Sequence, residues 1–367
     1  MKDVAARAGV SVKTVSNVVN GYPFIADDTR SRVRAAIEAL GYLPNATART
    51  LRVGRSEIIA LAVPELQVPY FAELAHHVVQ AADTLGLTVL VDETGADPAR
   101  ERLAAQGLRG QIIDGLVFSP LSLDDAQIAT YAARLPIVLL GERTAPGVAD
   151  IVRIDNVAAA DDATSYLLDT GRRRIGVLGT QSIAHGRTAQ LRQDGWARAH
   201  RRRGLEPDPT LTVELSAWHR AEGAAGARAL LARADRPDAL LCLNDTLALG
   251  ALAELRQAGL RVPDDIAVVG FDDIEESRFA VPPLTTVATD GALLARTAVQ
   301  LLVERIADPT GQPPRQVTIP HQLVKRESTA PMCLEPTDGM RRIAVRAPAT
   351  APATATRAAG AVDGWDG

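Results

Sequence analysis

The sequence predicts a small all-helical head followed by an α/β body of two lobes. Three observations support this prediction. The first 43 residues carry apolar side chains at helical spacing. From about residue 56, runs of Val, Ile and Leu alternate with alanine-rich segments. The charge changes at the same place, because residues 1–56 have a net charge of +5 and the remainder −9. Head and body are therefore expected to meet different partners.

Length and composition exclude several classes of protein. The chain has 367 residues, enough for more than one domain, with 47% apolar and 23% charged residues, as in ordinary globular proteins. Its two cysteines give neither a disulfide framework nor metal-ligand spacing. We find no signal peptide and no apolar run that could span a bilayer, so a cytoplasmic protein with no membrane partner is expected.

Three helices are predicted in the head. The first covers Lys2–Ala8 and ends at Gly9, where glycine can adopt the left-handed conformation that terminates helices. Ser11 can cap a second helix over Val12–Val19. Thr29–Leu40 carries its apolar residues on one stripe and forms the third helix.

The second helix has two chemically different faces. Val15, Val18 and Val19 lie on one side and can pack on the first helix. The opposite face carries Val12, the basic Lys13 and three short polar side chains, Ser16, Asn17 and Asn20. Short side chains let the backbone approach a flat, hydrogen-bonding surface such as the floor of the DNA major groove. The pattern indicates a helix-turn-helix; the alternative is a three-helix bundle that binds nothing.

The stretch "LPNATARTLRVGR" predicts a hinge helix. Asn45 follows Pro44 and can cap a helix over Ala46–Arg52, which is too short to be stable alone. It carries small residues, bases for phosphate contacts, and one large apolar side chain, Leu51, that could wedge between base pairs from the minor groove. In the free protein this segment could equally be a frayed linker.

The body is expected to contain two parallel sheets, since ten buried strands are too many for one doubly wound unit of this size. The predicted strands are 58–64, 87–93, 115–120, 136–141, 174–179, 211–216, 239–245, 266–273, 285–290 and 315–320. The tail from Pro331 has no apolar period and no heptads, so a disordered segment without a coiled coil is expected.

The runs "DVAARAGVSVKTVSNVVNG", "TRSRVRAAIEALGYLPNATARTLR" and "NDTLALGALAELRQAGLRVPDDIAVVGFDD" resemble the lactose-repressor (LacI/GalR) family of bacterial transcription regulators. The resemblance covers about residues 1–330. It implies a homodimer on a pseudo-palindromic DNA operator. It also implies a body like a type I periplasmic binding protein, with a small-molecule effector between two Rossmann-like lobes. The implied division is 1–43 for the helix-turn-helix, 44–57 for the hinge, 58–330 for the effector-binding and dimerisation domain, and 331–367 for the tail.

The resemblance also assigns DNA-binding residues. Val12, Lys13 and Asn17 match base-reading positions, and Leu51 matches the intercalating leucine. The rest of the implied DNA-binding set, in phosphate-contacting, capping or hinge positions, is Ser11, Thr14, Ser16, Asn20, Asn45, Ala48 and Arg52.

Three positions depart from the family pattern. Asn17 stands where the family often has Arg. Asn would favour adenine, whereas Arg favours guanine. Ala26 replaces a common capping Ser, so Asp27 or Asp28 is expected to substitute. The usual few residues before Met1 are absent, so either the true start lies upstream or the first helix is poorly capped.

Polar residues at predicted strand ends indicate a ligand cleft. By resemblance, Arg192, Asn244 and Asp272 match effector contacts, while Phe71 and Trp218 match aromatic walls. Carboxylate, amide, guanidinium and aromatic groups together are typical of sugar sites. Trp218 could equally be a core aromatic. Helix capping is the simpler interpretation for Asp245 and Asp273, and it is open for Asp155. The histidines lack metal-ligand spacing.

No nucleotide-binding glycine motif and no nucleophile with an arranged base is present, so neither an enzyme nor a cofactor is expected. The sequence predicts a ligand-responsive repressor released by a sugar-type effector. A regulator that depends on a purine-type corepressor is the alternative, and a solute-binding protein for import is a weaker one.

Overall fold

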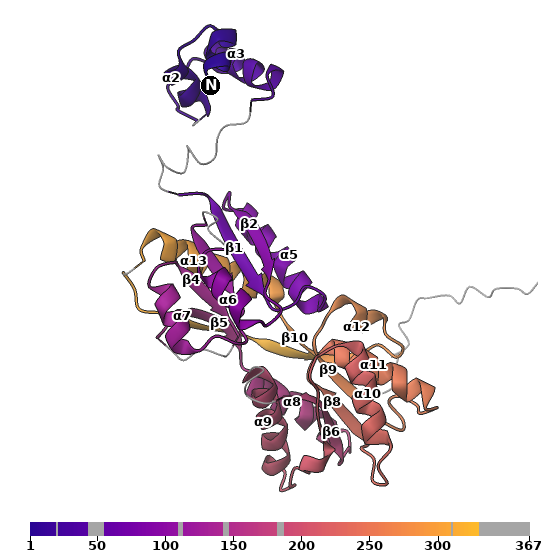
Figure 1. Ribbon diagram of the computed structural model, residues 1–367. Coiled ribbons are helices and arrows are strands. Elements are labelled where there is room, and N and C mark those ends of the chain that lie inside the picture. Colours follow the sequence, from indigo (N-terminus) through magenta and orange to yellow (C-terminus); the bar gives the residue numbers. More distant parts are fainter. Residues whose placement is uncertain are drawn as a thin grey trace, which may run out of the picture. The chain divides into compact units, whose positions relative to one another are not determined.

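The computed structural model describes residues 1–19, 21–42, 55–108, 113–141, 147–181, 187–309 and 311–329 (Figure 1). The head contains three helices, α1 (Lys2–Ala8), α2 (Val12–Val19) and α3 (Asp27–Ala39). Val4, Val15 and Val33, one from each helix, are fully buried and form the centre of the head's apolar core. The valine stripe predicted on the second helix therefore does pack inward.

The helix starts of the head differ in how they are capped. The Ser11 hydroxyl accepts a hydrogen bond from the Thr14 amide at 3.1 Å, which confirms it as the cap of α2. Ala26 is the N-cap of α3 and offers no side-chain acceptor. The prediction that Asp27 or Asp28 substitutes was wrong, because both lie inside the first turn, where a carboxylate interacts with the helix dipole instead.

The first lobe of the body is a six-stranded sheet in the order β11-β5-β4-β3-β1-β2. Its strands are β1 (Ile58–Val63), β2 (Thr88–Glu93), β3 (Gly115–Phe118), β4 (Ile137–Leu140), β5 (Asp150–Ile154) and β11 (Gln316–Ile319). Its helices are α5 (Pro69–Asp83), α6 (Pro98–Ala105), α7 (Asp125–Ala132) and α13 (Gly291–Ala307). One apolar core lies under α5 and α13, and a second lies on the other face of the sheet, under α6 and α7.

The second lobe repeats this plan in the order β12-β10-β9-β8-β6-β7. Its strands are β6 (Ile175–Thr180), β7 (Thr212–Glu214), β8 (Ala239–Cys242), β9 (Ala267–Asp272), β10 (Thr285–Thr289) and β12 (His321–Val324). Its helices are α8 (Asn156–Asp169), α9 (Arg187–Arg202), α10 (Arg220–Leu231), α11 (Asp245–Gln257) and α12 (Glu275–Phe279), with a short 3₁₀ turn, η2 (Pro209–Leu211). The predicted fold class, a helical head with two parallel-sheet lobes, is confirmed.

Each of the ten predicted strands overlaps an observed one, but β5 and β12 were missed. The apolar run of β5 is interrupted by Asp150 and Arg153. Asp150 is nevertheless completely buried, because Arg305 and Arg315 pair with its carboxylate at 3.0 and 3.2 Å. β12 is a short, half-exposed edge strand that pairs antiparallel with β10, whereas the other strand pairs are parallel. Neither strand has the continuous apolar pattern on which the prediction relied.

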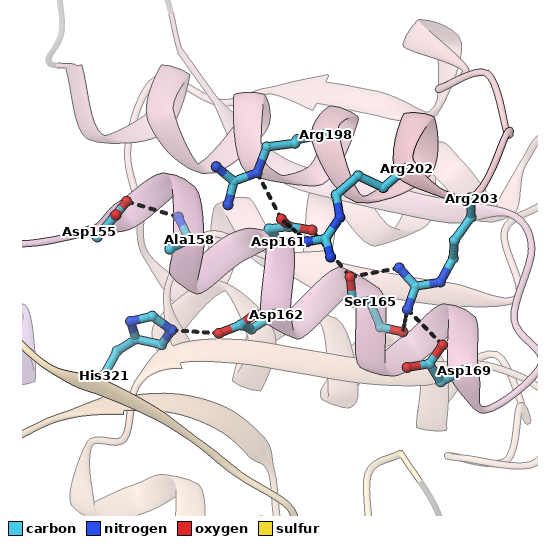
Figure 2. Close-up of polar contacts among 10 residues, drawn as sticks. All are labelled: Asp155, Ala158, Asp161, Asp162, Ser165, Asp169, Arg198, Arg202, Arg203 and His321. Carbon is cyan, nitrogen blue, oxygen red and sulfur yellow. Dashed lines mark hydrogen bonds and ion pairs between the residues drawn. The ribbon is translucent and has the colours of Figure 1, made fainter.

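A buried carboxylate joins α8 to α9 in the second lobe (Figure 2). Asp161 of α8 is 1% exposed and accepts hydrogen bonds from Arg198 at 2.7 Å and Arg202 at 2.9 Å, both on α9. The helices are close, since a Cβ added at Gly195 would lie 2.4 Å from the carbonyl oxygen of Val157. Charge pairing and a glycine contact therefore fix these two helices together.

The chain passes between the lobes three times, at residues 154–156, 289–291 and 319–321. Three adjacent crossovers form the arrangement in which two lobes can close by a hinge motion. None of the described helices is long and apolar enough to cross a membrane. Several predicted features fall outside the described residues, namely Asn20, the hinge residues Asn45, Ala48, Leu51 and Arg52, Cys333 and the tail from Pro331.

Candidate functional site

A cavity of about 550 Å³ lies between the two lobes. The first lobe contributes the segment after β1, the loop 119–122 and the end of β5 to its wall. The second lobe contributes the first turn of α9 and the ends of several strands. The structure brings all five predicted effector residues to this wall: Phe71, Arg192, Trp218, Asn244 and Asp272.

Arg192 is the most firmly held of the five. Its side chain is only 6% exposed, and its Nε donates to Asn156 Oδ1 at 2.7 Å. It also donates to the carbonyl oxygen of Leu243 and lies 3.9 Å from the centre of the Phe271 ring. The remaining terminal nitrogen lies 3.6 Å from Asp272 Oδ1. The guanidinium is therefore preorganised, with one edge directed toward the Asp272 carboxylate.

Asp272 is the last residue of β9, and its backbone is strained. Its φ of 107° is a conformation that side-chain-bearing residues rarely adopt, and such strain is often concentrated at functional sites. Burial raises the pKa of Asp272 to about 7, although the Arg192 charge acts in the opposite direction. The carboxyl group can therefore exchange its proton near neutral pH while it faces the cavity.

Asn244 and Trp218 act as one unit. Asn244 Oδ1 caps α11 by accepting from the Leu247 amide at 2.8 Å, and its Nδ2 donates to the carbonyl oxygen of Trp218 at 3.1 Å. The Trp218 indole donates to the carbonyl oxygen of Gly179 at 2.9 Å. Trp218 packs against both apolar cores of the second lobe, as a core aromatic does, and it also lines the cavity. Asn244 thus orients the aromatic wall.

The structure corrects two predicted helix caps, and it shows that Asp155, for which capping was left open, is a cap. Asp245 does not cap its own helix; its fully buried carboxylate accepts from Ser277, Thr286 and the Ile274 amide. Burial raises the pKa of Asp245 well above its usual value. Asp273 instead pairs with Arg326 at 2.5 Å and Arg278 at 3.7 Å. Asp155 does cap α8, through the Ala158 amide at 2.9 Å (Figure 2).

Sequence reasoning missed the residue that shapes the first-lobe wall. Glu101 of α6 is completely buried, and its carboxylate accepts from the amides of Leu121, Ser122 and Leu123 at 2.7–3.1 Å. These amides belong to the loop that lines the cavity. A glutamate in a short helix usually faces solvent, so no local signal distinguished this one.

Two contacts join the lobes beside the crossovers. His219 Nε2 lies 3.2 Å from Glu65 Oε1, and Glu65 also lines the cavity. Glu73 of α5 accepts a hydrogen bond from the Glu275 amide, in α12, at 3.1 Å. Burial raises the pKa of Glu73, and the nearby Glu276 carboxylate acts in the same direction. These two contacts link the lobes in addition to the crossovers.

The head presents a second polar surface. Ser11, Val12 and Lys13, at the start of α2, are exposed, while Thr14, Ser16 and Asn17 are half-buried. Val12 is apolar yet 42% exposed. The N-terminal part of α2 is thus free to contact a partner, as a recognition helix requires. Among the described residues, no group of His, Cys, Asp or Glu side chains is arranged to hold a metal ion.

Comparison with known proteins agrees with both surfaces. Residues 1–45 match the model of the bacterial regulatory proteins, lacI family, and residues 164–329 match the periplasmic binding protein-like domain. The transcriptional repressor PurR of Haemophilus influenzae is 34% identical over 334 residues, which cover 89% of this chain and 98% of that protein.

Two solved structures extend the likeness, each covering 89% of this chain and 98% of the other. One is a lac repressor dimer bound to operator and an anti-inducer, with 30% identity and a TM-score of 0.78. The other is a complex of the transcriptional regulator CelR with cellobiose, with 33% identity and a TM-score of 0.68. The chain therefore belongs to the LacI family of bacterial transcription regulators, as a DNA-binding repressor and not an enzyme.

Proposed function

We propose that this repressor binds a pseudo-palindromic operator as a homodimer and is released by a sugar-type effector bound between its lobes. The cavity is the observation that carries the proposal. It combines a carboxylate and a guanidinium, Asp272 and Arg192, with the aromatic side chains of Phe71 and Trp218. Such a set can hydrogen-bond vicinal hydroxyl groups while a ring covers the apolar face of a sugar. The cellobiose complex of a related regulator supports a sugar.

On DNA, each subunit of the dimer would use its own head. Val12, Lys13 and Asn17 would read base edges in the major groove, with Asn17 favouring adenine. Phosphate and cap contacts would come from Ser11, Thr14, Ser16 and Asn20, and hinge contacts from Asn45, Ala48, Leu51 and Arg52. Support comes from the exposed start of α2 and from the operator complex of the related lac repressor dimer.

Effector and operator binding would be coupled through the hinge, residues 44–57, between the head and the body at 58–330. If the lobes hold two hinges together, short helices can form in the minor groove and Leu51 can wedge between base pairs. Effector binding would change the arrangement of the lobes and separate the hinges. A coupling free energy of about 1–3 kcal/mol is enough to change operator affinity 5- to 150-fold.

The first experiment is a thermal-shift screen of the full chain against sugars and purines. A sugar that raises the melting temperature and weakens operator binding in a gel shift supports the proposal. A purine that strengthens operator binding would instead identify a corepressor and contradict it.

With the effector in hand, Asp272→Ala should bind operator normally but no longer respond to the effector, because the carboxylate that orients it is gone. Asp264→Ala, an exposed carboxylate of the same lobe, is the matched control and should respond like the parent protein. An unchanged dose–response curve for Asp272→Ala would rule out the cavity as the effector site.

A further inference from the structure

The turn after α2 carries two exposed aromatic side chains. Tyr22 is 48% exposed and Phe24 is 83% exposed, the largest exposed fraction of any large apolar side chain in the described part of the chain. Two of the five phenylalanines of the chain, Phe24 and Phe279, are largely exposed. Tyr22 and Phe24 are adjacent, and an exposed apolar patch, unlike a single exposed ring, points to a partner that covers it.

The turn is rigid and is attached to the recognition helix. The Tyr22 amide donates to the carbonyl oxygen of Asn17 at 2.9 Å. Arg30 of α3 donates to the carbonyl oxygens of Tyr22 and Ile25, at 3.3 and 3.4 Å, and Ile25 packs against the core of the head. The two rings meet edge to face, with centroids 5.7 Å apart. The backbone on both sides of Phe24 is therefore tied to α2 and α3, and the Phe24 ring contacts Tyr22.

The surroundings of this aromatic pair favour DNA as the partner. Tyr22 is hydrogen-bonded to Asn17 of α2, and the basic head, with a net charge of +5 over residues 1–56, attracts a polyanion. In the major groove the one apolar group on a base edge is the C5-methyl group of thymine, which phenylalanine can contact. Another copy of the chain, or another protein, would not require this position beside α2.

We propose that Phe24, supported by Tyr22, packs against a thymine methyl group at the edge of each operator half-site and adds a preference for thymine there. This inference rests on the proposed operator binding, and it adds a residue that the helix-turn-helix pattern does not include. The contact is apolar and specific, so it differs from the salt-dependent phosphate contacts made by the Lys and Arg side chains of the head.

The test uses the full chain and an operator recovered from a randomised duplex library. The affinity of the protein is measured for that operator and for the same duplex with every thymidine replaced by deoxyuridine, which lacks only the methyl group. The loss on replacement should be about 4-fold smaller per half-site in Phe24→Ala than in the parent protein, the factor expected for burial of one methyl group. Phe24→Leu should regain part of the sensitivity to methyl removal that Phe24→Ala loses.

Leu40→Ala is the matched control, since Leu40 is also an exposed apolar side chain of the head, at 42%. It should lose as much affinity on methyl removal as the parent protein. Circular dichroism should show the same melting curve for Phe24→Ala as for the parent protein, because an exposed ring leaves no cavity.

An equal loss on methyl removal in Phe24→Ala and the parent protein would overturn the proposal. So would a change in sedimentation of Phe24→Ala without any change in that loss, since the rings would then cover a protein surface. If the parent chain recovers no preferred sequence from the library, the proposed operator binding fails, rather than the role of Phe24 alone.

Discussion

Asp272 shows how much a single residue depends on its surroundings. An aspartate at the end of a strand is unremarkable in sequence, but burial raises its pKa from the usual 3.8 to about 7. The folded protein therefore keeps a proton, between pH about 4 and 7, that the unfolded chain releases. The contribution of the protonated Asp272 to stability is complete below the pKa of the unfolded state and is lost as pH rises through the pKa of the folded state.

We predict that Asp272→Asn removes this dependence. Between pH 5 and 8 the free energy of unfolding of the effector-free parent protein should decrease more steeply than that of the variant. Urea titrations at pH 5, 6, 7 and 8 measure the difference. Parallel profiles for the two proteins would mean that Asp272 titrates at its ordinary pKa despite its burial.

At the scale of the element, α8 depends on a cap that lies on a crossover. Asp155 is exposed and accepts a hydrogen bond from the Ala158 amide at 2.9 Å (Figure 2). We predict that Asp155→Ala lowers the free energy of unfolding by about 1 kcal/mol, because an orphan amide at the helix start loses its acceptor. Asp155→Asn retains an acceptor and should lose much less. Equal losses in urea unfolding of the two variants would show that charge, and not capping, is what matters.

At the scale of the whole molecule, the two lobes are joined by more than their three crossovers. The Glu65–His219 contact is about one-third exposed on each side, so it is worth about 0.2–1 kcal/mol. We predict that Glu65→Gln weakens effector binding by about 1.4- to 5-fold, because it removes a contact between the two lobes that form the cavity, and leaves operator affinity without effector unchanged. Calorimetry and gel shifts measure the two quantities.

His219→Gln distinguishes this effect from direct contact with the effector. His219 does not line the cavity, whereas Glu65 does. Loss of the shared contact should make the double variant no weaker than either single one. Additive losses would mean that Glu65 acts on the effector directly and that the lobes close without its help.

The sequence by itself determined the helical head, the Ser11 cap and ten of the twelve strands, because these depend on local periodicity and local hydrogen bonds. These features need only neighbours in the chain and the general rules of α/β topology. The five predicted effector residues came from the resemblance to a known family, and the fold gathers them around one cavity because the carboxyl ends of parallel strands meet at one edge of a sheet.

Only the tertiary structure decided what several polar side chains do. Asp150 is a strand residue because Arg305 and Arg315 neutralise it from distant segments, and Glu101 is buried because three amides of a separate loop surround it. Asp245, expected to cap its own helix, instead ties that helix to α12 and β10. The free energy of a buried charge depends on groups brought close by folding, and sequence spacing carries no record of them.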